Sequence, residues 1–144
     1  MANSIKDSID VKASAEELFQ VATDFETYPD WNPNIKETAI KETDEEGRPT
    51  QVWFKVDAKL KVLSYTLGYD YSNAPDSFSW DLVEGDVKTL RGSYTFDEFD
   101  DVTEVVYEME IDPGFPVPGF LKKQAEKQIA RSALEDLKKR VESS

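Results

Sequence analysis

The sequence contains neither cysteine nor histidine among its 144 residues, and each absence limits what the protein can do. Without cysteine the chain forms no disulfide, which is typical of proteins in a reducing cytosol. Without histidine it builds no Ser-His-Asp or Cys-His nucleophile system and no imidazole metal site. Acid–base chemistry would have to come from Asp, Glu, Lys, Arg or Tyr. We expect a cytoplasmic protein with no metal site and no cofactor.

Long apolar runs are also missing. The first seven residues lack the apolar stretch of a secretion signal, and no segment approaches the ~20 apolar residues that cross a bilayer. Basic residues are few, 17 against 30 acidic ones, giving a net charge of −13. Such a surface repels phosphate backbones and anionic lipid headgroups. We therefore expect no nucleic-acid partner and no stable membrane association; the acidity favours solubility, with DNA mimicry as a remote alternative.

The length fits one domain over residues 1–144, expected to be a monomer or weak dimer. An opening strand is predicted near residues 5–12, because apolar and polar residues alternate there. Ser14-Ala15-Glu16-Glu17 has the form of a capping box, so a helix should begin there and stop near Asp24. A short turn of helix from Phe25 to Tyr28 is expected to end at Pro29.

The middle of the chain, from Ile35 to Asp112, alternates between apolar and polar residues and is interrupted by turn residues. Six strands joined by tight turns are predicted, forming an antiparallel meander with one buried face. A long helix of 24 residues follows, from Pro118 to Val141. Its predicted apolar row recurs every fourth residue, and Ala130 and Leu134 widen it. The row consists of Val117, Leu121, Ala125, Ile129, Ala133, Leu137 and Val141.

Three local motifs accompany this order of elements. They are Asp24-Phe25-x-x-Tyr28-Pro29-x-Trp31-x-Pro33, Gly92-Ser93-Tyr94-Thr95-Phe96 and Thr103-Glu104-Val105-x-Tyr107. With them, the whole chain resembles the START-like, or Bet v 1-like (SRPBCC), superfamily, in its polyketide cyclase/dehydrase and lipid-transport branch. The resemblance implies an α+β helix-grip fold. In that fold a curved antiparallel sheet of about seven strands wraps around the long C-terminal helix, and two short helices separate the first two strands.

The resemblance also implies a cavity between the long helix and the concave face of the sheet. Tyr65, Tyr69, Tyr94 and Tyr107 fall in the inward register of their strands. A buried tyrosine hydroxyl without a partner costs roughly 1–3 kcal/mol, so several of them facing one interior indicate that water or a ligand supplies partners. The alternative is that they lie near the rim with their hydroxyls in solvent.

Small residues on the last helix also favour a cavity, although close helix–sheet packing is an alternative. The predicted ligand-binding residues are Phe54, Val56, Tyr65, Leu67, Tyr69, Trp80, Tyr94, Phe96, Tyr107, Met109, Leu121, Ala125, Gln128 and Ile129. Trp31, Phe115 and Phe120 are predicted to lie at the cavity entrance, or else to pin loops. Asp7 is an unusual carboxylate in an apolar series, and an exposed edge-strand position explains it better than catalysis does.

The family has no universal catalytic motif, so the resemblance assigns no catalytic residue here. Three functions stay open at this point. The first, which the missing histidine favours, is binding or carriage of a small hydrophobic ligand such as a lipid, quinone or polyketide-like molecule. The second is an enzyme, an aromatase/cyclase or dehydratase. The third is a protein-interaction partner, for example in a toxin–antitoxin pair, whose cavity is vestigial.

Overall fold

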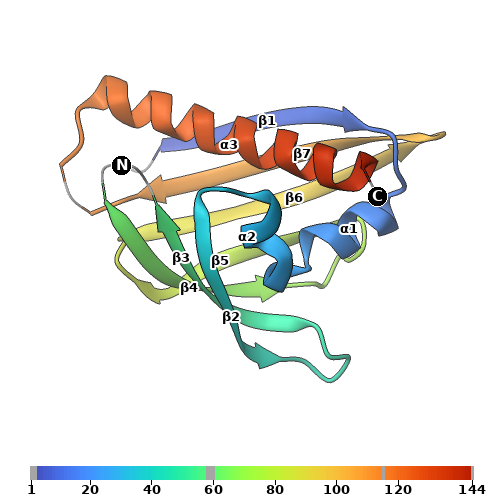
Figure 1. Ribbon diagram of the computed structural model, residues 1–144, viewed down its shortest axis with the longest axis horizontal. Helices are drawn as coiled ribbons and strands as arrows, with labels where there is room; N and C mark the ends of the chain where they lie inside the picture. Colours follow the sequence, from blue (N-terminus) through green and yellow to red (C-terminus); the bar gives the residue numbers. More distant parts are fainter. Residues whose placement is uncertain (1–2, 58–60, 115, 144) are drawn as a thin grey trace.

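The computed structural model describes residues 3–57, 61–114 and 116–143, and they form a curved sheet with a long helix lying across its concave face (Figure 1). The sheet has seven antiparallel strands in the order β1-β7-β6-β5-β4-β3-β2. Their bounds are β1 Asn3–Val11, β2 Ile35–Thr43, β3 Pro49–Asp57, β4 Val62–Asp70, β5 Ser77–Gly85, β6 Thr89–Phe99 and β7 Val102–Asp112. β1 and β2 are the two edge strands.

The alternation of the sequence determines which side chains face the helix. In β7, Thr103, Val105, Tyr107 and Met109 are buried, whereas Glu104 and Glu108 between them are exposed. Successive side chains of a strand point to opposite faces, so one face of the sheet becomes apolar and the other polar. The apolar concave face is the one that α3 covers.

Short helices separate β1 from β2, as predicted: α1 Ala15–Ala22, the 3₁₀ turn η1 Phe25–Thr27 and α2 Tyr28–Trp31. The side chain of Ser14 accepts a hydrogen bond from the backbone N–H of Glu17 at 3.1 Å, which confirms the predicted start of α1. The expectation that Pro29 ends the helical turn is wrong. Pro29 lies in the first turn of α2, where its missing N–H costs no hydrogen bond.

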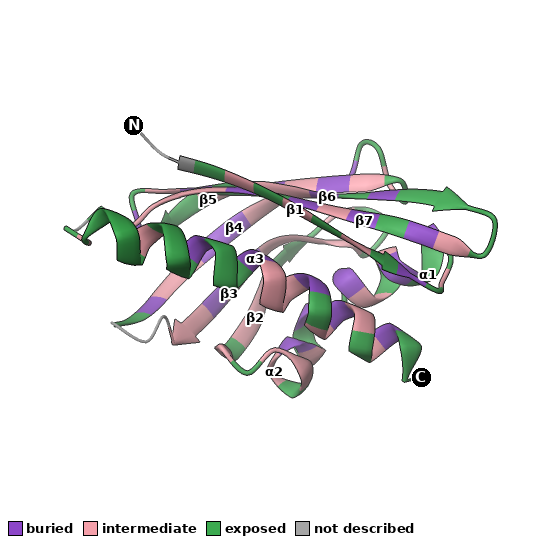
Figure 2. Ribbon diagram, turned by 90° about the horizontal axis from the view of Figure 1, so that it is seen from above, coloured by how far each residue is buried: buried purple, intermediate pink, exposed green. Residues whose placement is uncertain are grey.

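The long helix α3, Gly119–Glu142, lies against β1, β7 and α1. The predicted apolar row holds only in its C-terminal half, where Ala130, Leu134, Leu137 and Val141 are buried. In its N-terminal half Leu121, Ala125 and Ile129 are exposed instead, and the first turns appear mostly green in Figure 2. The buried apolar side chains of α3 therefore lie in its C-terminal half, and the N-terminal half contributes the buried Glu126.

These elements form the helix-grip arrangement that the resemblance implied, so the predicted fold class is confirmed. None of the helices in the described part of the chain is both long enough and apolar enough to span a bilayer.

Candidate functional site

A cavity of about 160 Å³ lies between α3 and the concave face of the sheet. Its walls come from the strands β2 to β7, from α2 with the segment after it, and from the middle of α3. The lining residues are Tyr28, Asn32, Asn34, Ile35, Phe54, Val56, Leu63, Tyr65, Leu67, Tyr69, Phe78, Trp80, Val87, Leu90, Tyr94, Tyr107, Met109, Ile111, Ile129, Ser132 and Ala133.

Aromatic rings form much of this lining. Tyr94 of β6 lies at the centre of the group, with its ring centroid 5.1 Å from Tyr107 and 5.6 Å from Trp80. Tyr69 of β4 lies 6.0 Å from Trp80 and 4.6 Å from Phe25. The rings are tilted against one another, the geometry in which ring edges meet ring faces favourably. The concave face therefore offers ring surfaces to any molecule in the cavity.

The six tyrosine hydroxyls differ in their hydrogen bonding. Tyr28 donates to the backbone oxygen of Ala22, Tyr71 to that of Pro49, and Tyr107 to the sulfur of Met109 at 3.5 Å. The hydroxyls of Tyr65, Tyr69 and Tyr94 form no hydrogen bond with the residues that the structure describes. These three tyrosines line the cavity, so their hydroxyls are free to bond with a guest molecule.

Burial fixes the protonation state of these phenols. It raises the pKa of Tyr69, Tyr94 and Tyr107 above the ordinary tyrosine value, because the charged phenolate would lose its hydration. At neutral pH the hydroxyls stay protonated and act as hydrogen-bond donors and acceptors, and they are poor bases.

Ten of the fourteen residues predicted to bind ligand lie in the cavity lining. They are Phe54, Val56, Tyr65, Leu67, Tyr69, Trp80, Tyr94, Tyr107, Met109 and Ile129. The structure does not bring the other four there. Phe96 is buried beyond Tyr94, at a ring-centroid distance of 5.9 Å. Leu121 and Ala125 are exposed in the first turns of α3, and Gln128 is exposed farther along the helix, where it donates to Ser132 at 3.1 Å.

Of the residues predicted at the entrance, Trp31 is half-buried against Tyr28, with ring centroids 4.8 Å apart, and Asn32 beside it lines the cavity. Phe120 is 74% exposed on α3, away from the lining. Phe115 falls outside the described residues.

Several lining residues were missing from the sequence-based prediction. Phe78 and Leu90 belong to the same alternating series as Trp80 and Tyr94, so the two-residue period contained the signal for them. Tyr28 and Asn32 come from the short helix α2 and the segment after it. No periodicity in the sequence indicates that this segment closes the cavity.

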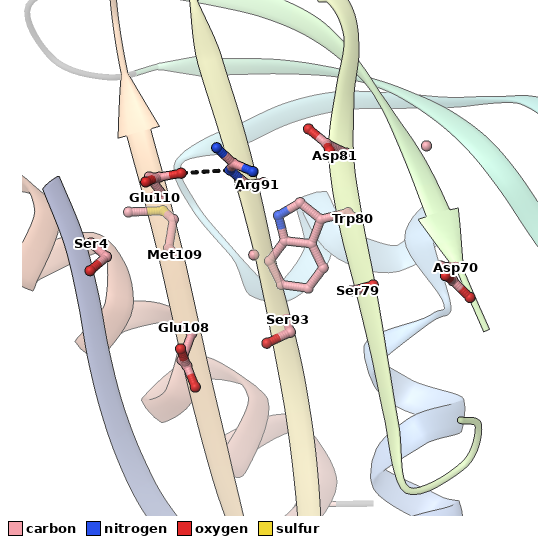
Figure 3. A pocket seen from close by; sticks show the side chains of 12 residues that line it. Ser4, Asp70, Ser79, Trp80, Asp81, Arg91, Ser93, Glu108, Met109 and Glu110 are labelled. Carbon is pink, nitrogen blue, oxygen red and sulfur yellow. Dashed lines mark hydrogen bonds and ion pairs between the residues drawn. The ribbon is translucent and has the colours of Figure 1, made fainter. Parts of the chain in front are cut away.

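A second, larger depression of about 710 Å³ lies on the outer face of the sheet (Figure 3). It is open, and its walls are mostly polar: Ser79, Ser93 and Glu108 lie near an ion pair between Arg91 and Glu110, whose Nε and Oε2 atoms are 2.5 Å apart. Gly68 and Gly92 also line it. Its polar character does not suit an apolar ligand, so the interior cavity is the candidate site.

Comparison with known proteins assigns the chain to a protein family. No curated protein matches the sequence significantly. A START superfamily protein from Mycobacterium smegmatis is similar in structure, with 25% identity, a TM-score of 0.89, and 97% of each chain covered. An aromatase/cyclase from Streptomyces sp. R1128 superposes with a TM-score of 0.83 at 16% identity, covering 99% of this chain and 94% of its own.

A STAR-related lipid transfer protein from Xanthomonas axonopodis superposes with a TM-score of 0.73 at 16% identity, covering 96% of this chain and 85% of its own fragment. At these low identities the last two likenesses concern the fold alone. The sequence itself supplies the family, because residues 11–138 match its pattern. The chain belongs to the polyketide cyclase / dehydrase and lipid transport family.

Proposed function

We infer that the protein binds a small hydrophobic ligand with an aromatic or polycyclic body in the cavity between α3 and the sheet. The observation that carries this proposal is the lining, which combines aromatic rings with three tyrosine hydroxyls that bond to no described residue. Burial of the ligand's apolar surface drives binding, and the hydroxyls of Tyr65, Tyr69 and Tyr94 orient its polar atoms.

The cavity volume limits the size of the ligand. An apolar cavity of roughly 150 Å³ in another protein holds benzene, whereas drug-sized ligands occupy roughly 300–1,000 Å³. At about 160 Å³, the cavity in its present conformation fits a body of one or two rings. A larger ligand requires the N-terminal half of α3 to move outward. The exposure of Leu121 (37%) and Ile129 (36%) supports such a movement, since neither of these apolar side chains is packed into the core.

The lining also favours binding over acid–base catalysis. Among the described residues that line the cavity, none is Asp, Glu, Lys or Arg. The phenols there have raised pKa values and stay protonated at neutral pH. A cyclase or dehydratase would need a group that takes up a proton, and these tyrosines do so poorly.

Native mass spectrometry of gently purified protein, together with calorimetric titration, tests the proposal. The titrant is 2-naphthalenemethanol, a neutral two-ring alcohol. We expect a co-purifying small molecule or saturable one-to-one binding of the titrant, weakened more by Trp80→Ala than by Trp53→Ala. Trp80 lines the cavity, whereas Trp53 lies on β3 outside the lining. Absence of both a co-purified molecule and saturable binding would refute ligand binding.

A further inference from the structure

We propose that the cavity selects ligands that carry a positively charged amine on a flat apolar body and excludes carboxylates such as free fatty acids. The inference rests on the proposed function, because it specifies the ligand of the same cavity. It rests on two observations. Cationic side chains are absent from the described lining, and acidic side chains of α3 lie next to it.

The described part of the lining is rich in aromatic rings and contains no cationic side chain. Eight of its residues are aromatic: Tyr28, Phe54, Tyr65, Tyr69, Phe78, Trp80, Tyr94 and Tyr107. The face of an aromatic ring carries partial negative charge and attracts a cation placed over it. No lysine or arginine is among the lining residues that the structure describes. A bound carboxylate could accept hydrogen bonds from the tyrosine hydroxyls but would find no positively charged partner.

Asp136 provides negative charge behind this lining. It lies on α3 one turn beyond Ser132, whose side chain lines the cavity. The Oδ2 atom of Asp136 is shielded from solvent and has no hydrogen-bond partner. Its charge acts on the cavity, because Asp136 contributes to the raised pKa of Tyr94. Asp136 is thus an acceptor without a partner, close to a residue of the cavity wall.

The charged groups around Asp136 leave its charge largely uncompensated. Burial is the main cause of the raised pKa of Asp136, while Lys139 lowers this pKa and Glu135 raises it. A cation in the cavity would partly compensate the negative charge of Asp136 and would contact the aromatic rings at the same time. A carboxylate ligand would instead add a second negative charge beside it, where little water can screen the two.

Glu126 adds a second acidic group on the other side of the lining segment. It lies three residues before Ile129 and is only 5% exposed, and its Oε2 atom is buried without a partner. Lys122 and Lys123 partly offset its charge. Asp136 and Glu126 are ten residues apart, roughly 15 Å along α3, so on each side of the lining segment the helix carries one carboxyl oxygen that is shielded from solvent.

Three probes that share the naphthalene ring system and carry polar groups of different charge test the inference. They are 2-naphthylmethylamine, a cation at pH 7, the neutral 2-naphthalenemethanol, and the anion 2-naphthoate, each titrated by calorimetry at about 0.15 M salt to screen the net charge of the surface. We expect the amine to bind at least about tenfold more tightly than naphthoate, with the alcohol between them.

Two variants separate the effect of Asp136 from that of the protein's overall charge. The quantity compared is the ratio of the affinities for the amine and for naphthoate, called the gap below. Asp136→Asn keeps the shape of the side chain and should narrow the gap between amine and naphthoate by at least about threefold. Glu135→Gln removes the same charge from a neighbouring side chain that is 54% exposed, and it should leave the gap nearly unchanged.

Naphthoate binding as tightly as the amine, or an equal change of the gap in both variants, would overturn the charge selection. If the alcohol binds normally while no charge preference exists, only this inference fails. If none of the three probes binds and no small molecule co-purifies, the proposed function fails with it.

Discussion

Asp7 on the edge strand β1 and Arg131 in the middle of α3 form a two-pronged ion pair across 124 positions of sequence. Nε of Arg131 donates to Oδ2 at 2.9 Å and Nη2 donates to Oδ1 at 2.7 Å, while Nη2 also reaches the backbone oxygen of Ser8 at 3.0 Å. The pair joins α3 to β1 at the boundary between its buried C-terminal half and its exposed N-terminal half. The ion pair therefore fixes the middle of α3, the helix that covers the cavity, to the edge of the sheet.

Breaking this pair should destabilise the fold. A double-mutant cycle of Asp7→Ala and Arg131→Ala, followed by urea unfolding, should give a coupling free energy of about 1 kcal/mol, since paired hydrogen bonds strengthen an ion pair and partial exposure weakens it. The matched control is Lys6 with Glu108, which are 3.8 Å apart with both side chains mostly exposed. Its cycle should give almost no coupling. Equal coupling in the two cycles would contradict the anchoring role of Arg131.

The stabilisation of the fold by Asp7 should depend on pH and be lost in strong acid. The guanidinium of Arg131 lowers the pKa of Asp7 below its ordinary value. A carboxyl group with a lowered folded-state pKa stabilises the fold above its unfolded-state pKa of about 3.9 and loses that effect as the pH falls through the folded-state pKa. The stability difference between wild type and Asp7→Asn should thus be constant near neutral pH and disappear in strong acid. A difference that survives in strong acid would exclude the ion pair as its cause.

The buried tyrosines predict how the protein responds to alkali. Burial raises the pKa of Tyr28, Tyr94 and Tyr107 above the ordinary value. Their contribution to stability is therefore complete below the unfolded-state pKa of about 10 and is lost as the pH rises above it. In an ultraviolet titration, tyrosinate absorbance should develop together with the loss of circular dichroism. Complete ionisation of the tyrosines in a protein that is still folded would contradict their burial.

The close contact of Gly92 and Trp80 makes a further prediction. A Cβ atom on Gly92 would lie 2.7 Å from Cζ2 of Trp80 and 2.5 Å from the backbone oxygen of Glu108. Gly92→Ala should destabilise the fold by about 1–3 kcal/mol and shift the fluorescence of Trp80, because the indole must move. Gly119→Ala is the control, since no atom lies within 4 Å of its added Cβ. If both variants unfold at the same urea concentration as wild type, the packing described for Trp80 is incorrect.

The sequence predicts the fold better than the site, and particular residues explain why. Alternation along the strands and the length of the last helix are local patterns, so the sheet, α3 and the Ser14 cap could be predicted. The approach of Arg131 to Asp7 depends on how α3 crosses the sheet, which no local pattern encodes. The burial of Glu126 and the exposure of Leu121 also depend on how α3 lies against the rest of the fold, and the residue types themselves suggest the opposite.

Filling the cavity tests the central claim most directly. Ala133 of α3 lines the cavity, so Ala133→Phe should occupy the space that a ligand needs, whereas Ala125→Phe adds the same ring at an exposed position of the same helix. Titration with 2-naphthalenemethanol is the measurement, made on variants whose folding is verified by circular dichroism. We expect Ala133→Phe to weaken binding at least about tenfold and Ala125→Phe to bind like wild type. A folded Ala133→Phe protein that binds the probe as tightly as wild type would contradict binding in this cavity.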